Sequence, residues 1–258
     1  MTDERFDPTR RDALQRCCAL AVLISALARS QAWAGSRPAH LDRWARDLVT
    51  LNDDLRQNKI GVAAWQARVE HLNRSVGVGE LAGYLDIDRL AREFTYPSNL
   101  AEFADPILPA DVLGSKPKNW FMRVFGMRRG GAIIPHVHNH MVSAHLVVSG
   151  AFHARTHDRI ADIDNAVMLR PSIDRPLALG DIISMSDQRD NQHWLIAEKD
   201  RSMTFDVGVV DVPASWKYGL AANKNYMIFV DAGRKPESSG LVRAPVMTFE
   251  QCAAKYAT

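Results

Sequence analysis

Two histidines separated by one residue, His136 and His138, have the spacing best suited to metal chemistry in this chain. Residues two apart on a β-strand project from the same face, so both imidazoles would point the same way. If that face lines the interior of a small barrel, the two rings can hold one metal ion. The pair therefore predicts a buried metal site, with strands on either side to position it.

The residues around this pair follow a regular spacing. The order is Gly130, five residues, His136 to His138, four residues, Ser143, six residues, and Gly150. This spacing resembles the first signature of the cupin superfamily, which usually has a glutamate ligand at the place of Ser143. The usual site of three histidines and one glutamate is therefore not expected here.

A second stretch resembles the other cupin signature less closely. Gly180 begins a predicted turn into a strand, and His193 stands where the family has its third histidine ligand. The spacing between them is two residues longer than in the family. Three further departures from the signature are Ser186, Gln188 and Ala197. The two signatures span residues 120–229, and the resemblance implies a metal site made of His136, His138 and His193.

Short apolar segments separated by turns favour the same fold independently of the histidines. They are rich in Val, Ile, Leu, Met and aromatic residues, as strands are. The segments are 121–127, 144–149, 166–169, 181–185, 194–197, 203–210 and 226–230. Many short strands predict a mainly β protein, a sandwich or barrel. The double-stranded β-helix of cupins, a jelly-roll barrel, is the version that the resemblance implies.

Ser143 affects the expected chemistry because a serine hydroxyl is a poor ligand beside three imidazoles. The site would be neutral and would keep positions open for water, substrate or O2. It is similar to the sites of thiol dioxygenases and some diketone-cleaving cupins, which implies Fe(II), with Mn, Zn, Ni or Cu as alternatives. The sequence shows no Ser-His-Tyr relay that would support a thiol substrate.

Two other function classes stay open. Some cupins with incomplete ligand sets are isomerases or lyases, in which the metal polarises a carbonyl and a nearby side chain transfers a proton. A cupin that binds a metal or small ligand without catalysis is the third class. In each case the expected partner is a small molecule, joined by O2 in the dioxygenase.

Two more histidines lie close to the predicted ligands. His145 has the same parity as Ser143 on a strand, so it is a candidate fourth ligand or proton shuttle, or else a packed interior histidine. His140 either continues the inward row or begins a turn.

Candidate substrate contacts come from other segments. Arg123 would clamp a carboxylate if it points inward, and would otherwise lie on an exposed face. Tyr218 and Tyr226 are further candidates. Asp206 alternates with Thr204, and the sequence does not decide whether they face inward or outward.

The N-terminus resembles a twin-arginine export signal. Arg10 and Arg11 precede an apolar run over residues 17–28 that is too short to span a bilayer comfortably. The tripeptide ending at Ala34 has the small-x-small form of a signal-peptidase site. We expect cleavage after Ala34, a periplasmic mature chain and no membrane anchor after cleavage. The alternative is an ordinary amphipathic first helix.

Apolar residues at three- and four-residue spacing predict a helical hairpin before the barrel, over residues 41–55 and 62–72, and a third helix over 80–94. The expected divisions are a signal peptide (1–34), a helical region (35–96), a connector (97–117), a cupin barrel (118–232) and a C-terminal tail (233–258).

The composition sets broad limits. The 258 residues are 47% hydrophobic and 24% charged, with a formal net charge of +2. The sequence lacks a stripe of basic residues of the kind that indicates nucleic-acid binding. Cys17 and Cys18 would leave with the signal, so Cys252 would have no disulfide partner in the mature chain. Exposed strand edges are compatible with a homodimer.

Overall fold

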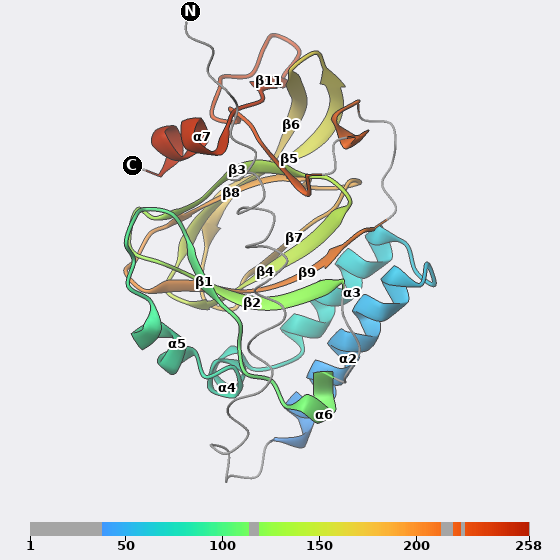
Figure 1. The fold of residues 1–258 in the computed structure, drawn as a ribbon, viewed down its shortest axis with the longest axis vertical. Helices are drawn as coiled ribbons and strands as arrows, with labels where there is room; N and C mark the ends of the chain where they lie inside the picture. The colour runs from blue at the N-terminus through green and yellow to red at the C-terminus, as the bar shows by residue number, and fades with distance from the viewer. Residues whose placement is uncertain (1–37, 114–118, 213–218, 223–224, 258) are drawn as a thin grey trace, which may run out of the picture. The chain divides into compact units, whose positions relative to one another are not determined.

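The structure of the protein is a computed structural model that describes residues 38–113, 119–212, 219–222 and 225–257 (Figure 1). The predicted export signal and Tyr218 lie outside the described residues. Residues from Ala39 onward form one compact unit, so the helical region and the barrel are not separate domains. No helix among the described residues is long and apolar enough to cross a membrane.

In the part of the chain that the structure describes, four helices lie ahead of β1: α2 (Ala39–Arg56), α3 (Val62–Arg74), α4 (Val78–Tyr84) and α5 (Ile87–Glu93). The predicted third helix over residues 80–94 is thus two short helices. The break lies at Asp86, whose backbone is left-handed (φ 54°, ψ 47°) and cannot continue a right-handed helix. The expected connector contains β1 (Glu102–Ala104) and the short helix α6 (Ala110–Leu113).

Ten further strands form the barrel and its extensions. They are β2 (Trp120–Met127), β3 (Ala132–His138), β4 (Met141–Ser149), β5 (Phe152–Ile163), β6 (Ala166–Leu177), β7 (Ile182–Met185), β8 (Gln192–Ala197), β9 (Ser202–Val210), β10 (Met227–Phe229) and β11 (Val242–Pro245). A 3-10 turn, η2 (Gly219–Ala222), precedes β10, and helix α7 (Phe249–Tyr256) follows β11.

The strand order identifies the fold. One sheet has the order β1-β2-β9-β4-β7, and the other has β10-β3-β8-β5-β6-β11, with every pair of neighbouring strands antiparallel. The eight central strands therefore form the sets β2-β9-β4-β7 and β3-β8-β5-β6, which is jelly-roll topology. This is the predicted double-stranded β-helix with an N-terminal helical region, and Figure 1 shows its two facing sheets.

The N-terminal helices cover the outer face of the β1-β2-β9-β4-β7 sheet (Figure 1). Trp44 of α2 is 2% exposed, and its ring centroid lies 5.7 Å from that of Phe205 on β9. Trp120 of β2 donates its indole N–H to Asp53 of α2 (3.2 Å). The apolar helix stripe is therefore packing surface against the barrel, as its spacing indicates.

Helix α7 covers the outer face of β3 and β8. Cys252 and Tyr256 are buried there against Ile134 and Trp194. The helix begins with a capping box, in which Thr248 and Gln251 satisfy each other's backbone N–H groups. Both α7 and β11 lie in the segment that the sequence analysis describes only as a C-terminal tail.

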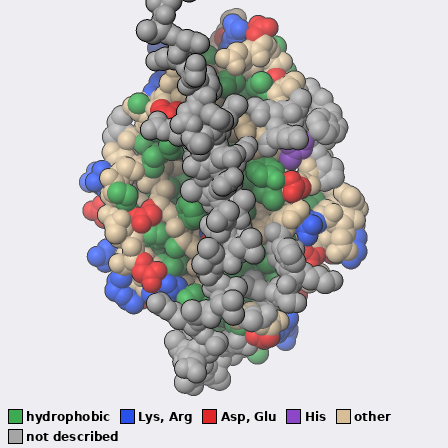
Figure 2. All heavy atoms as spheres, in the orientation of Figure 1, with side chains coloured by type: hydrophobic (Ala, Val, Ile, Leu, Met, Phe, Trp, Pro, Cys, Tyr) green, Lys and Arg blue, Asp and Glu red, His purple; other side chains and the backbone are tan. Residues whose placement is uncertain are grey.

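The barrel interior has an apolar end, where buried residues of both sheets meet. This cluster contains Met127, Val147, Phe152, Ala154, Leu177, Ile183, Met185, Leu195 and Ala197. On the outside, acidic and basic side chains are interspersed over the described part of the face in Figure 2, as the near-balanced composition suggests.

Candidate metal centre

A β-bulge in β3 changes which residues of that strand face inward. Ile133 pairs with Leu195 of β8, and His136 pairs with His193. Three steps along β3 thus match two steps along β8, which is the register shift of a bulge. Pro135 lies within the shift, where a residue without a backbone N–H does not interrupt the ladder.

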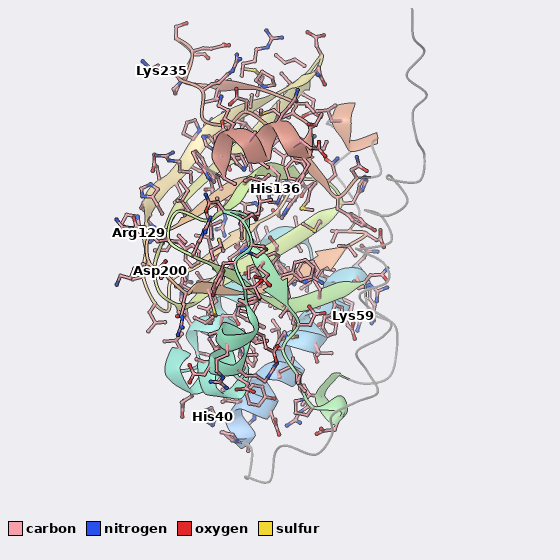
Figure 3. All side chains as sticks on the ribbon, turned by 60° about the vertical axis from the view of Figure 1, so that its left-hand side comes forward. His40, Lys59, Arg129, His136, Asp200 and Lys235 are labelled. Atoms are coloured by element: carbon pink, nitrogen blue, oxygen red, sulfur yellow. The ribbon has the colours of Figure 1, made fainter. Side chains whose placement is uncertain are left out.

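The bulge places the two histidines inside the barrel. Before it, Ala132 and Ile134 point outward and pack under α7. Strict alternation would have placed His136 and His138 on that same outer face. The extra residue reverses the parity, so both imidazoles share the inner face. Figure 3 shows His136 within the body of the molecule.

The structure brings His136, His138 and His193 together. Their candidate ligand nitrogens all lie within 4.8 Å of one another. The side chains are buried, with 4%, 2% and 1% of their residues' surface exposed. Two imidazoles on one tetrahedral metal have nitrogens about 3.4 Å apart, so small side-chain movements suffice to close the site.

The hydrogen bonds of the three rings fit a metal ligand set. His136 Nδ1 lies 2.8 Å from the carbonyl oxygen of Ile134, which leaves Nε2 for a ligand bond. Nδ1 of His138 and Nδ1 of His193 are buried and have no hydrogen-bond partner among the described residues. Buried polar atoms are normally satisfied, so this grouping is better explained by a bound ion than by packing.

Burial keeps the three rings neutral. Desolvation lowers the pKa of His136 to about 4, although its bond to the Ile134 carbonyl opposes the shift. The pKa values of His138 and His193 fall well below the usual range, first because of burial and then because neighbouring imidazoles repel a proton. A metal binds the deprotonated ring, so at neutral pH no proton has to leave these ligands.

Ser143, His145 and Asp206 form a relay beside the cluster. Ser143 Oγ lies 3.3 Å from His145 Nε2, and Asp206 Oδ2 lies 2.5 Å from His145 Nδ1. The His145 ring centroid is 4.9 Å from that of His193. His145 lies next to the three-histidine group and not within it, which favours the proton-shuttle alternative over a fourth ligand.

Asp206 is the functional candidate that the sequence could not place. It pairs in register with His145 across β9 and β4, so both side chains lie on the inner face. The residue is 1% exposed, and neither carboxylate oxygen has a well-aligned hydrogen-bond donor among the described residues. Only the register of β9, which the sequence does not fix, could have identified it.

Arg123 also lies on the inner face, in register with Asp206, but at the edge of the barrel. Its Nε is 3.3 Å from Asp105 Oδ1, and its guanidinium carbon lies 4.3 Å from the Phe103 ring centroid and 4.9 Å from that of Phe121. Its charge is therefore already balanced by a carboxylate. The inward position is the one that the predicted carboxylate clamp requires, and the clamp itself stays a prediction.

The structure assigns Tyr226 to the surface. Its hydroxyl donates to Asp211 Oδ1 (2.7 Å), and 36% of the residue is exposed, in contrast to the buried histidines. The predicted substrate contact by Tyr226 is therefore not supported. His140 has a left-handed backbone (φ 51°) between β3 and β4, so it begins the turn and does not continue the inward row.

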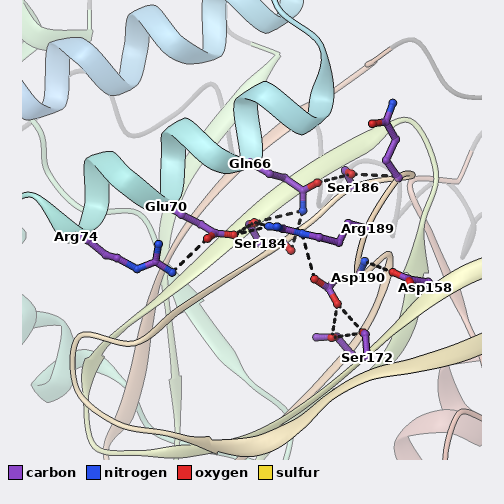
Figure 4. A network of polar contacts seen from close by, with 11 residues as sticks. Gln66, Glu70, Arg74, Asp158, Ser172, Ser184, Ser186, Arg189 and Asp190 are labelled. Atoms are coloured by element: carbon purple, nitrogen blue, oxygen red, sulfur yellow. Dashed lines mark hydrogen bonds and ion pairs between the residues drawn. The ribbon is translucent and has the colours of Figure 1, made fainter.

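A polar network joins α3 to the loop that leads into His193 (Figure 4). Gln66 donates to the backbone oxygen of Ser184 (2.9 Å) and accepts from Ser186 Oγ (2.6 Å). On the same helix, Glu70 accepts from Arg189 (2.6 Å). The helical layer thus anchors the β7–β8 loop at Ser186 and Arg189.

Comparisons with known proteins find likeness in structure only. No protein-family model matches the chain, and no curated protein matches it in sequence. A protein with a double-stranded β-helix domain from Klebsiella pneumoniae is 19% identical, with 48% of this chain and 84% of that chain covered and a TM-score of 0.32.

Two other solved structures are similarly distant. A cupin superfamily protein from Desulfitobacterium hafniense is 12% identical, over 47% of this chain and 88% of that chain, with a TM-score of 0.31. An oxalate oxidase structure is 14% identical, with 46% of this chain and 55% of that chain covered and a TM-score of 0.31. The strand order of this protein therefore carries the fold assignment by itself, and the chain is similar to proteins described as cupins.

Proposed function

We propose that this protein is a cupin-type metalloenzyme in which His136, His138 and His193 bind one divalent transition metal. The observation that carries the proposal is the convergence of three buried, neutral imidazoles inside a double-stranded β-helix. Two of these rings have an Nδ1 atom without a described partner. Structural histidines in a core are usually hydrogen-bonded, whereas metal ligands need free nitrogens.

The reaction that we propose is oxidation of a small organic substrate by O2, with Fe(II) as the metal. Three neutral protein ligands leave open coordination positions, because Ser143 replaces the usual fourth ligand. Bound Fe(II) would supply coordination positions for substrate and O2 and would pass electrons from the substrate, which is oxidised, to O2, which is reduced. The protein would exclude bulk water, since every ligand is nearly fully buried.

The relay beside the cluster would handle the substrate proton. Asp206 Oδ2 lies 2.5 Å from His145 Nδ1, and Nε2 of the same ring lies 3.3 Å from Ser143 Oγ. In this arrangement, the Ser143 hydroxyl passes a proton from substrate to His145 Nε2, and Asp206 stabilises the charged imidazole. An aspartate thus takes the third place in the relay, which a tyrosine holds in a Ser-His-Tyr relay.

The same relay favours one alternative function. A metal that polarises a carbonyl, together with a base held by a carboxylate, is also the arrangement needed for an isomerase or lyase. Such an enzyme would need no O2 and would work with Zn, Mn or Ni. The two proposals therefore differ in their use of O2 and not in their residues.

An oxygen-electrode experiment distinguishes the two. Protein reconstituted with Fe(II) or with Zn(II) is given a panel of small organic acids, diketones and thiols, and both O2 uptake and product are followed. O2 uptake with the Fe(II) form alone supports the dioxygenase. Product formation by both forms without O2 uptake contradicts it and favours the isomerase or lyase. His40→Ala, at an exposed histidine of α2, is the control for non-specific metal.

We also propose that the protein works in the periplasm. The proposal rests on the twin arginines and the signal-peptidase site near the N-terminus. Export of a chain already folded around its metal would protect Fe(II) or Mn from competition by Cu and Zn, which histidines bind more tightly. The double substitution Arg10→Lys and Arg11→Lys should retain the protein in the cytoplasm, as measured by cell fractionation. Unchanged periplasmic recovery would contradict the proposed route.

A further inference from the structure

The backbone carbonyl of His138 receives two side-chain donors at the end of the histidine strand. Arg159 donates through Nη1 at 3.2 Å, and Asn191 donates through Nδ2 at 3.1 Å. Arg159 is 4% exposed and Asn191 is 1% exposed. Charged and amide side chains are seldom buried this deeply, so the position has a specific use.

Arg159 is itself held rigidly. Its Nε and Nη2 donate to the two oxygens of Asp162, at 2.9 and 2.7 Å, in a bidentate pair whose side chains are 1% and 3% exposed. Asp162 Oδ2 also accepts from the backbone N–H of Leu220 in η2 (2.7 Å). The third guanidinium nitrogen, Nη1, is therefore held in a fixed position.

The same Arg159 nitrogen reaches the next residue of the strand. Nη1 donates to Asn139 Oδ1 (2.7 Å), and the amide of Asn139 donates to the carbonyl oxygens of Leu220 and Asn225 (3.1 and 3.2 Å). One guanidinium thus connects β5, the end of β3 and the segment before β10.

On the side of β3 that faces β8, these contacts take the place of backbone hydrogen bonds where the β3–β8 ladder stops, while the other side stays paired with β10. Val137 is the last residue of β3 that pairs with β8, and its partner is Gln192. The next residue toward the loop is Asn191, and it reaches His138 with its side chain. Without the two donors, the carbonyl of a ligand residue would be buried and poorly held.

We propose that Arg159 and Asn191 are positioning residues of the metal centre, which fix the backbone of His138 and so its imidazole relative to His136 and His193. The inference rests on the proposed metal site. A buried ion pair contributes little net stability, because desolvation of both ions offsets their attraction. Its value here is geometric: a metal site with preorganised ligands binds its ion more tightly.

The test compares Arg159→Lys and Asn191→Ala with wild type. A lysine keeps the charge but cannot donate to both Asp162 oxygens and also to His138. Asn191→Ala removes one donor and leaves the Arg159–Asp162 pair intact. The matched control is Asn52→Ala, which removes the buried bond from Trp65 to Asn52 (2.9 Å) in the helical layer.

The measurements are Co(II) affinity, by competition with a chelator, and the visible spectrum of bound Co(II), which reports ligand geometry. We expect affinity to fall about 10- to 100-fold in Arg159→Lys. We expect a smaller fall in Asn191→Ala, with altered Co(II) bands in both. Asn52→Ala should lower the melting temperature and leave affinity and spectrum unchanged.

Three outcomes would overturn the inference in distinguishable ways. Wild-type affinity and spectrum in both variants would mean that the donors do not position the ligand. A loss of Co(II) affinity in Asn52→Ala as large as that in Arg159→Lys would mean that lower overall stability causes the loss of affinity. Wild-type protein that binds no Co(II) would remove the metal centre itself. If Arg159→Lys does not fold, Asn191→Ala still decides the question.

Discussion

Asp206 Oδ2 lies 2.5 Å from Nδ1 of His145 inside the barrel. The two residues are neighbours across β9 and β4, and each is less than 5% exposed. A buried carboxylate in this place favours the tautomer of His145 that carries its proton on Nδ1. Nε2 is then free to accept a proton from Ser143, 3.3 Å away.

Asp206→Asn should reverse that tautomer. The amide can donate to Nδ1, which would move the ring proton to Nε2 and block acceptance from Ser143. We expect turnover to fall at least about 10²-fold, the usual scale of acid–base catalysis, with metal content unchanged. Nitrogen NMR of histidine-labelled, Zn-loaded protein should show the tautomer change directly. Asp105→Asn, at the carboxylate paired with Arg123, is the control. An unchanged His145 tautomer in Asp206→Asn would refute the relay.

The metal-free protein should lose stability as the pH falls from about 6.5 toward about 4. Unfolded histidines take up protons below about pH 6.5, whereas in the folded state His136 does so only near pH 4 because burial lowers its pKa. The unfolded state therefore binds more protons in this window, and the free energy of unfolding decreases by about 1.4 kcal/mol per pH unit for each such ring. Urea unfolding at several pH values measures the slope.

His136→Gln should make that slope smaller, because one titrating ring is removed from the unfolded state. His40→Gln removes a histidine with an exposed side chain in α2 and serves as the control. The same slope in His136→Gln and wild type would show that the buried cluster does not account for the loss of stability in acid.

The two glycines of the first signature should differ in their tolerance of alanine. Both have a left-handed backbone, with φ of 80° at Gly130 and 70° at Gly150. A side chain at Gly130 meets nothing within 4 Å, whereas one at Gly150 would lie 2.7 Å from Cα of Ser202. Gly130→Ala should cost about 1–2 kcal/mol of unfolding free energy. Gly150→Ala should cost roughly 3 kcal/mol, because overpacking adds to the backbone strain. Equal costs in chemical denaturation would mean that the Ser202 contact relaxes freely.

Cys252 should be unreactive in the folded protein. Cys252 lies on the inner face of α7, where its thiol is fully buried 3.5 Å from the carbonyl oxygen of Pro135. Burial raises the pKa of the thiol to about 12. The thiolate is the nucleophile, so iodoacetamide at pH 8 should modify Cys252 at least about 100-fold more slowly than in urea. Mass spectrometry of the peptide that contains Cys252 measures this. Comparable rates with and without urea would show that α7 does not protect the thiol.

Much of the barrel could be predicted because its strands alternate with clear turns. The spacing of His136 and His138, together with the resemblance to the cupin signatures for His193, located the three residues that converge. Strand β5 was missed because its outer face carries His153 and Arg155, so it lacks an apolar run. The break at Asp86 was missed because one left-handed residue within a helical pattern leaves little trace in sequence.

The rest of the site could not be predicted because it depends on the register of strand pairing, which a single sequence does not fix. The bulge at Pro135 reverses the parity of β3, and without it the two histidines would face α7. Asp206 reaches His145 only through the pairing of β9 with β4. Arg159 reaches His138 from a distant strand in the same way. Such contacts arise from non-local pairing, and local patterns carry little information about them.

The most direct test of the account is the metal content of protein purified from its native export route without chelators. Plasma mass spectrometry is applied to wild type, to His193→Ala and to His40→Ala. The account predicts close to one equivalent of a transition metal, with iron favoured, in wild type and in His40→Ala, and its loss in His193→Ala. Wild type without metal, or His193→Ala with undiminished metal, would contradict the three-histidine centre.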